Sequence, residues 1–218
     1  MSLDLNLKDM ERRAFRSTYQ DGLLDINIGG TLAGFALLTG IPDSEDFPLA
    51  RFLLFMGVLA LSSLIFWAGK KFITLPRLGQ VKFGAERRKR KRTLALILAG
   101  IILIQVTIVL FSIALWAKPE LAVRIGLLSS DQRATDLLVA SLGALFVGPS
   151  MALIAYFSDF PRGYYIAIIM SMAVFLMIWL GKPAYLMVAA ALIILPGVVL
   201  FLRFLQQHPR PPAAVLNA

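Results

Sequence analysis

The sequence contains no cysteine and a single histidine, His208. Without cysteine, disulfides, thiolate nucleophiles and cysteine metal sites are all excluded. The motifs HExxH, GxSxG and GxxxxGK[ST] are absent as well, and no closely spaced set of carboxylates suits a metal ion. We therefore expect a protein that is not an enzyme, with no catalytic residues, no metal and no cofactor.

Acidic residues are scarce relative to basic ones, 13 against 22, which gives a formal net charge of +9. Most of the excess lies in one segment, residues 70–92, which reads KKFITLPRLGQVKFGAERRKRKR and contains only one acid, Glu86. This segment lies between two long apolar runs, where membrane orientation and attraction to anionic lipid account for its charge. We therefore expect no nucleic-acid partner.

Long polar stretches are also few. Hydrophobic residues make up 58% of the chain and its mean hydropathy is +0.76, whereas soluble domains contain about 45–50% apolar residues. A bilayer core of about 30 Å needs about 20 apolar residues per helix. The sequence therefore predicts an all-α integral membrane protein with six transmembrane helices, at residues 23–41, 48–68, 93–116, 135–157, 164–180 and 184–202.

Lys and Arg near helix ends are retained on the cytoplasmic side, so segment 70–92 sets the orientation of its neighbours. With both termini in the cytoplasm, most of the basic residues fall on the cytoplasmic side of the inner membrane. The predicted organisation is an interfacial segment at 1–22, a transmembrane domain at 23–202 with a basic cytoplasmic loop at 70–92, and a cytoplasmic tail at 203–218.

An internal repeat ends the even-numbered spans. Residues 72–77, 157–162 and 205–210 each consist of an apolar residue, three further residues, and Pro-Arg. One interpretation is three helical hairpins descended from one unit. The other is that proline stops a helix and arginine meets the inner interface, so that Pro-Arg arises there independently.

The basic loop has two halves. Pro and Gly within residues 72–84 predict an extended or hairpin segment on the membrane surface, and residues 86–92 predict the first turns of the third span. Membrane lipid with anionic headgroups is the expected partner; the alternative is a topology signal alone. The residues expected to bind lipid are Lys70, Lys71, Arg77, Lys82, Arg87, Arg88, Lys89 and Arg90.

Polar groups within the spans are few, and a charge in hydrocarbon is a functional candidate because it costs about 2.5–3.5 kcal/mol on insertion scales. Asp25, with Asp21 and Asn27, could line a polar entrance that binds a cation or takes up a proton. Alternatively, the two carboxylates are simply favourable beside the positive end of the helix dipole. Gln105 either hydrogen-bonds a neighbouring helix or lines a solute path.

Two further features concern packing. Gly148-Pro149 and Pro196-Gly197 predict helix breaks or kinks, which transporters use to build substrate sites and other helices use for packing. Gly30 and Gly34 stand four residues apart, a spacing that lets two helices approach closely. We expect the chain to form a homo-oligomer through such small-residue faces.

Three stretches, 19–26 (YQDGLLDI), 73–83 (ITLPRLGQVKF) and 160–165 (FPRGYY), resemble motifs of a group of uncharacterised prokaryotic multi-span membrane proteins. The resemblance covers less than a fifth of the chain, with the motifs in the same order and placement. It implies a small inner-membrane protein of prokaryotic type and carries no known activity.

These observations favour a non-enzymatic membrane module of regulatory or scaffolding type, whose basic loop contacts anionic lipid or a partner. The alternative is a small transporter or channel for an ion or small solute, using Asp25, Asn27 and Gln105.

Overall fold

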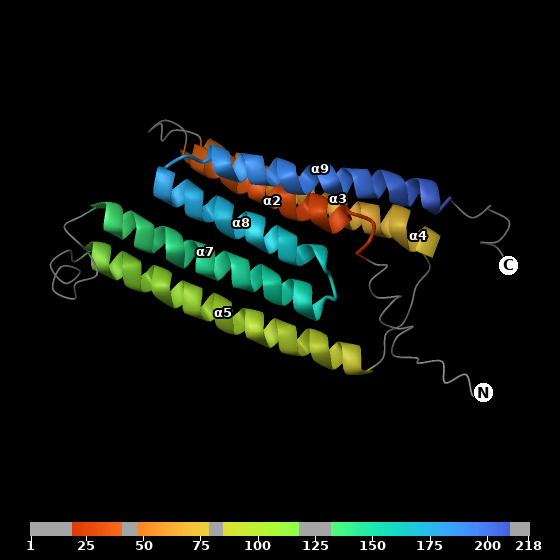
Figure 1. Cartoon of the computed structure of the whole chain (residues 1–218), viewed down its shortest axis with the longest axis horizontal. Coiled ribbons are helices and arrows are strands. Elements are labelled where there is room, and N and C mark those ends of the chain that lie inside the picture. Colours follow the sequence, from red (N-terminus) through yellow and green to blue (C-terminus); the bar gives the residue numbers. More distant parts are fainter. Residues whose placement is uncertain (1–18, 41–47, 79–84, 118–131, 210–218) are drawn as a thin grey trace. The chain divides into compact units, whose positions relative to one another are not determined.

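The computed structural model describes residues 19–40, 48–78, 85–117 and 132–209, and in these ranges every regular element is helical (Figure 1). Five helical stretches are long and apolar enough to cross a membrane, so the chain is a multi-span membrane protein. The elements in chain order are α2 (Leu23–Gly40), α3 (Pro48–Ala68), the π-helix η1 (Gly69–Thr74), α4 (Leu75–Leu78), α5 (Ala85–Ala117), α7 (Gln132–Phe157), α8 (Arg162–Leu180) and α9 (Ala184–Gln207).

The observed helices follow the predicted spans closely, because apolar runs and their flanking turn residues set the boundaries. Proline, which suits the first helical turn, is the first residue of α3 and directly precedes α8 and α9. Gly181 ends α8 with a φ of 63°, the left-handed conformation common after a helix. The third predicted span lies within α5, whose apolar stretch Arg92–Ile108 is shorter than the five spanning stretches.

The chain divides into two compact units, Met1–Phe83 with Pro183–Ala218, and Gly84–Lys182. In the first, which we call unit 1, α2 packs against both α3 and α9. Gly29 faces α9, where an added Cβ would lie 2.5 Å from Ile194, and Gly30 faces α3, where an added Cβ would lie 2.6 Å from the Ser62 hydroxyl. The glycines therefore bring α2 close to both neighbours.

The contacts of α2 show its direction relative to each neighbour. Gly34 lies beside Val58 and Leu23 beside Gly69, so α2 and α3 form an antiparallel hairpin. Because Gly30 and Gly34 both face α3, the close approach that their spacing predicts occurs within the chain. The proposed self-association therefore has to use other residues.

The second unit, unit 2, contains α5, α7 and α8, which run side by side with alternating directions (Figure 1). The helices α7 and α8 form its main interface. Their connection is tight: Asp159 has a φ of 50°, and a Cβ added to Gly163 would lie 2.5 Å from Ala155. The buried core consists of Ala140, Met151, Ala155, Phe160, Ile166, Ala167 and Ala173.

The helices α7 and α9 continue through Pro149 and Pro196, so neither Gly148-Pro149 nor Pro196-Gly197 interrupts its helix, and a kink at either place stays a prediction. Proline leaves the carbonyl four residues earlier without its helical donor, and neighbouring helices can satisfy backbone groups that are freed in this way. In α7, the hydroxyl of Ser171 donates a hydrogen bond of 3.0 Å to the carbonyl of Ala144, one residue before the affected position.

Two predicted segments outside the spans are also helical. Residues 72–78 belong to η1 and α4 rather than to an extended or hairpin segment, because a local π turn accommodates Pro76 without ending the helix. Residues 203–207, assigned to the tail, continue α9. The remaining tail residues 210–218 and the interfacial segment 1–18 lie outside the described residues.

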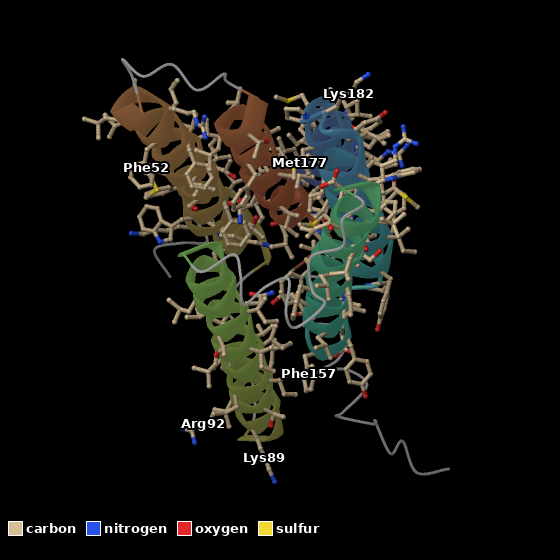
Figure 2. All side chains as sticks on the ribbon, turned by 90° about the vertical axis from the view of Figure 1, so that its left-hand side faces the viewer. Phe52, Lys89, Arg92, Phe157, Met177 and Lys182 are labelled. Carbon is tan, nitrogen blue, oxygen red and sulfur yellow. The ribbon has the colours of Figure 1, made fainter. Side chains whose placement is uncertain are left out.

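Large apolar side chains project outward from most of the helices, as Phe52 does from α3 (Figure 2). In water such surfaces would drive association, whereas in a membrane they face lipid chains. The buried polar side chains of unit 1 are therefore the exception, and they define its candidate site.

Candidate functional site

Asp21 is completely buried, just before the first turn of α2. Its Oδ2 accepts a hydrogen bond of 2.7 Å from Lys70 Nζ, which is also an ion pair, and one of 2.6 Å from the Thr74 hydroxyl. Its Oδ1 accepts a bond of 3.3 Å from the backbone N–H of Leu23. Both carboxylate oxygens are thus engaged, and we call Asp21, Lys70 and Thr74 the Asp21 cluster.

Glycines allow the backbone to reach this arrangement. Gly22 has a φ of 73°, and an added Cβ would lie 2.2 Å from the carbonyl oxygen of Gly197 in α9. Gly69 opens the π-helix, where an added Cβ would lie 2.7 Å from Leu23. Side chains at these two positions would push α2 away from both neighbours, so the glycines are needed for Asp21 to meet its partners.

The π-helix decides which side chains of this segment face α2. The N–H of Leu75 bonds to the carbonyl of Lys70, a spacing of five residues in place of the usual four. Lys70 and Thr74 both reach Asp21 from within this turn. π-bulges are frequent at functional sites, and this one directs a lysine into the helix bundle instead of toward lipid.

Asp25 lies one helical turn beyond Asp21 and is also buried, with 3% of its surface exposed. It packs on α9 at the position predicted to break, since a Cβ added to Gly197 would lie 2.9 Å from Asp25 Cβ. Asn27 faces α3 instead, where the Ser62 hydroxyl lies 3.0 Å from both its backbone and its side-chain oxygen. Asp25 and Asn27 thus serve different helix interfaces.

Lys71 points away from the Asp21 cluster and is exposed. Its Nζ lies 4.6 Å from the centre of the Trp67 ring and 5.5 Å from that of Phe72, and the two rings meet edge to face at 6.0 Å. A cation over exposed aromatic rings is typical of the membrane interface, where such rings gather. Lys70 and Lys71 therefore differ in environment although they are adjacent.

The other predicted site residues are not brought to this cluster by any described contact. Lys89 and Arg92 are exposed and point outward from the first turns of α5 (Figure 2). Gln105 lies on α5 in unit 2 and is partly exposed. Lys82 lies outside the described residues, and the side chains of Arg87, Arg88 and Arg90 are likewise not described.

Sequence reasoning missed two side chains that make these contacts, Thr74 and Ser62, and it did not foresee that Lys70, expected to bind lipid, pairs with Asp21. A hydroxyl in an apolar helix is the only signal that either position carried. Within the described ranges, no group of three or more His, Asp or Glu side chains could hold a metal ion. The Asp21 cluster can hold charge and join α2 to the π-helix.

Comparisons of the chain with protein-family models, with curated proteins and with solved structures found no significant match. Any function must therefore be argued from the geometry of the site itself.

Proposed function

We propose that this protein is a non-enzymatic scaffolding or regulatory module of the inner membrane, which holds a basic cytoplasmic segment against anionic lipid. The observation that carries the proposal is the Asp21 cluster, because it joins the start of the first span to the segment that bears Lys71 and Arg77. The proposal includes six spans, with α5 as the sixth, and both termini in the cytoplasm.

Helix length supports the membrane depth of this segment. The continuous helical stretch Leu49–Arg77 contains 29 residues and is about 43 Å long at 1.5 Å per residue. A bilayer with its headgroups is about 40–45 Å thick. If Leu49 starts in one headgroup layer, Arg77 reaches the other, and Lys70 lies about 10 Å deeper, near the edge of the hydrocarbon.

The proposed depths of Lys70 and Lys71 in the membrane account for their different surroundings. Lys70, at the deeper level, is paired with Asp21, since an unpaired charge there is costly. Lys71 extends to the interface beside Trp67 and Phe72. A basic residue near an anionic surface contributes about 1 kcal/mol of attraction, so Lys71 and the exposed Lys89 favour anionic lipid around the protein.

The test is the composition of the lipid extracted with the protein into polymer-bounded discs from membranes of mixed phosphatidylglycerol and phosphatidylethanolamine. We expect phosphatidylglycerol to be enriched around the native protein and less so around Lys71→Gln with Lys89→Gln. Lys182→Gln removes an exposed charge at the opposite, outer end and is the control. No enrichment in the native protein would refute the proposal.

One observation supports a second candidate, a small cation or proton transporter: the carboxylate of Asp25 is buried within α2, a helix of spanning length. Asn27 is less available to a transported ion than the sequence suggested, because its side-chain oxygen already contacts the Ser62 hydroxyl. Asp25→Asn should abolish cation-coupled flux in reconstituted vesicles if this function holds. Flux that persists in the variant would remove Asp25 from the mechanism.

The proposed scaffolding function also includes self-association of the chain. Its test is the subunit number measured by native mass spectrometry.

A further inference from the structure

Arg77 differs from every other basic residue of unit 1 that the structure describes. It is only partly exposed, and its Nε and Nη1 are buried, with no hydrogen-bond acceptor among the residues that the structure describes. By contrast, Lys70 is paired with Asp21, and Lys71 and Arg203 are exposed. A buried guanidinium N–H without an acceptor is costly, so the partly exposed side chain would gain by turning its N–H groups to an acceptor outside the chain.

The described part of unit 1 offers no carboxylate for this role. Its only acidic residues are Asp21 and Asp25. Asp21 has both oxygens engaged by Lys70, Thr74 and Leu23. Asp25 lies one turn further along α2, against Gly197 of α9. Among the described residues of unit 1, therefore, no carboxylate is left to accept a hydrogen bond from Arg77.

The position of Arg77 identifies the chemistry of that acceptor. Arg77 lies next to the last residue of α4, at the end of the 29-residue candidate span Leu49–Arg77, which places it in a headgroup layer when Leu49 starts in the opposite one. The abundant anionic acceptors at this depth are phosphoryl oxygens. Guanidinium is the side chain best suited to phosphate, because it is planar, always charged and offers several donors in fixed directions.

We infer that Arg77 is the core of a discrete oxyanion site that binds one phosphoryl group, either the headgroup of an anionic phospholipid or free phosphate. The inference rests on the proposed function for the orientation of the helix, and it goes further by naming one residue and one bound group. Lys71, which is exposed beside aromatic rings, attracts lipid in general. Arg77 holds a single phosphoryl group that exchanges slowly.

The test is native mass spectrometry of the full chain released from phosphatidylglycerol-containing micelles, with the number of retained lipids counted as collision energy rises. The native protein should keep one phosphatidylglycerol after the others have left. Arg77→Gln should lose it, with affinity at least about tenfold weaker, because charge-assisted hydrogen bonds are removed. Arg203→Gln, which removes the same charge from an exposed position in unit 1, should keep it.

A second experiment distinguishes a lipid headgroup from free phosphate as the bound group. Inorganic phosphate is titrated into protein held in phosphatidylcholine alone: binding that Arg77→Gln abolishes identifies free phosphate, and absence of binding, with one lipid retained in the first arm, identifies the headgroup. Arg77→Lys keeps the charge but not the planar fork, and should weaken retention while preserving thermal stability, so that loss of folding is not mistaken for loss of the site.

The inference is overturned if Arg77→Gln retains the last lipid as the native protein does, or if the native protein retains neither lipid nor phosphate. Failure of the proposed function looks different. In that case Lys71→Gln with Lys89→Gln leaves the lipid composition of the discs unchanged, whatever Arg77 binds.

Discussion

The two units bury different kinds of group between their helices. In unit 1 the start of α2 carries two buried carboxylates, Asp21 and Asp25, and one of them forms an ion pair with Lys70. In unit 2 the interface of α7 and α8 contains a hydroxyl-to-carbonyl bond, from Ser171 to Ala144. Both units rely on glycines for close approach, and unit 2 also buries a carboxylate, that of Asp159 in the turn between α7 and α8. The contrast is therefore between the Asp21–Lys70 ion pair of unit 1 and the neutral bond that joins α7 to α8.

This difference has a direct energetic consequence. Hydrogen bonds between membrane helices contribute about 0.6 kcal/mol on average, whereas breaking a buried ion pair by removing one partner costs about 3–5 kcal/mol. Unit 1 should therefore be sensitive to single changes that unit 2 tolerates. The predictions below test this contrast in order of decreasing effect.

The largest effect is expected for Lys70→Met, which leaves the Asp21 carboxylate buried without its counter-charge. We expect a loss of about 3–5 kcal/mol in the free energy of unfolding, measured by titrating micelle-bound protein with a denaturing detergent. Lys71→Met is the control, because Lys71 is exposed, and it should change stability by less than about 0.5 kcal/mol. Equal stability of the two variants would contradict the assignment of Lys70 as the counter-charge of Asp21.

The next effect is expected for Gly22→Ala. This residue has a φ of 73°, and an added Cβ would lie 2.2 Å from the Gly197 carbonyl oxygen, so the change combines backbone strain with a clash between α2 and α9. We expect a loss of about 2–3 kcal/mol. In Gly57→Ala the new methyl group meets nothing within 4 Å, and this control should gain up to about 1 kcal/mol.

Much of the fold could be predicted from the sequence, and particular residues show why. The α3 helix occupies the predicted residues 48–68 because apolar length and Pro48 define it locally. The helix through residues 72–78 could not be predicted, since Pro76 normally ends a helix and the compensating π turn has no sequence signal. For the same reason Pro149 and Pro196 looked like breaks.

The candidate site could be predicted only in part. Asp21 and Asp25 stood out because carboxylates are rare in apolar runs. The side chains around them could not be predicted, because Lys70 lies 49 residues from Asp21 in sequence and the direction of its side chain depends on the π turn. A pattern with a period of 3.6 residues cannot reveal which of two adjacent lysines faces inward. Lys70 was therefore grouped with the lipid-binding residues, although it pairs with Asp21.

A smaller effect is expected in unit 2 for Ser171→Ala, which removes the donor to Ala144 beside Pro149. The loss should be about 0.6 kcal/mol and at most about 1.7 kcal/mol. The control is Ser141→Ala, which removes a hydroxyl that bonds to the Leu137 carbonyl of its own helix and should cost less because it joins no second helix. A loss as large as that of Lys70→Met would remove the contrast between the units.

The smallest effect is expected for Ser62→Ala in unit 1, which removes the hydroxyl facing Asn27. The loss should be about 0.6 kcal/mol, comparable to that of Ser171→Ala in unit 2, when both are measured by the same detergent titration. Similar values would show that neutral bonds contribute alike in both units. A clearly larger loss at Ser62 would show that the sensitivity of unit 1 is not confined to its ion pair.

The most direct test of the central claim is a double-mutant cycle on Asp21→Asn and Lys70→Met, with the free energy of unfolding measured for each single variant and for the pair. The account predicts that the double variant recovers much of the loss seen in Lys70→Met, with a coupling energy in the upper part of the range of about 0.5–3 kcal/mol that contacting residues show. Strictly additive losses would contradict it, because Asp21 and Lys70 would then contribute to stability independently.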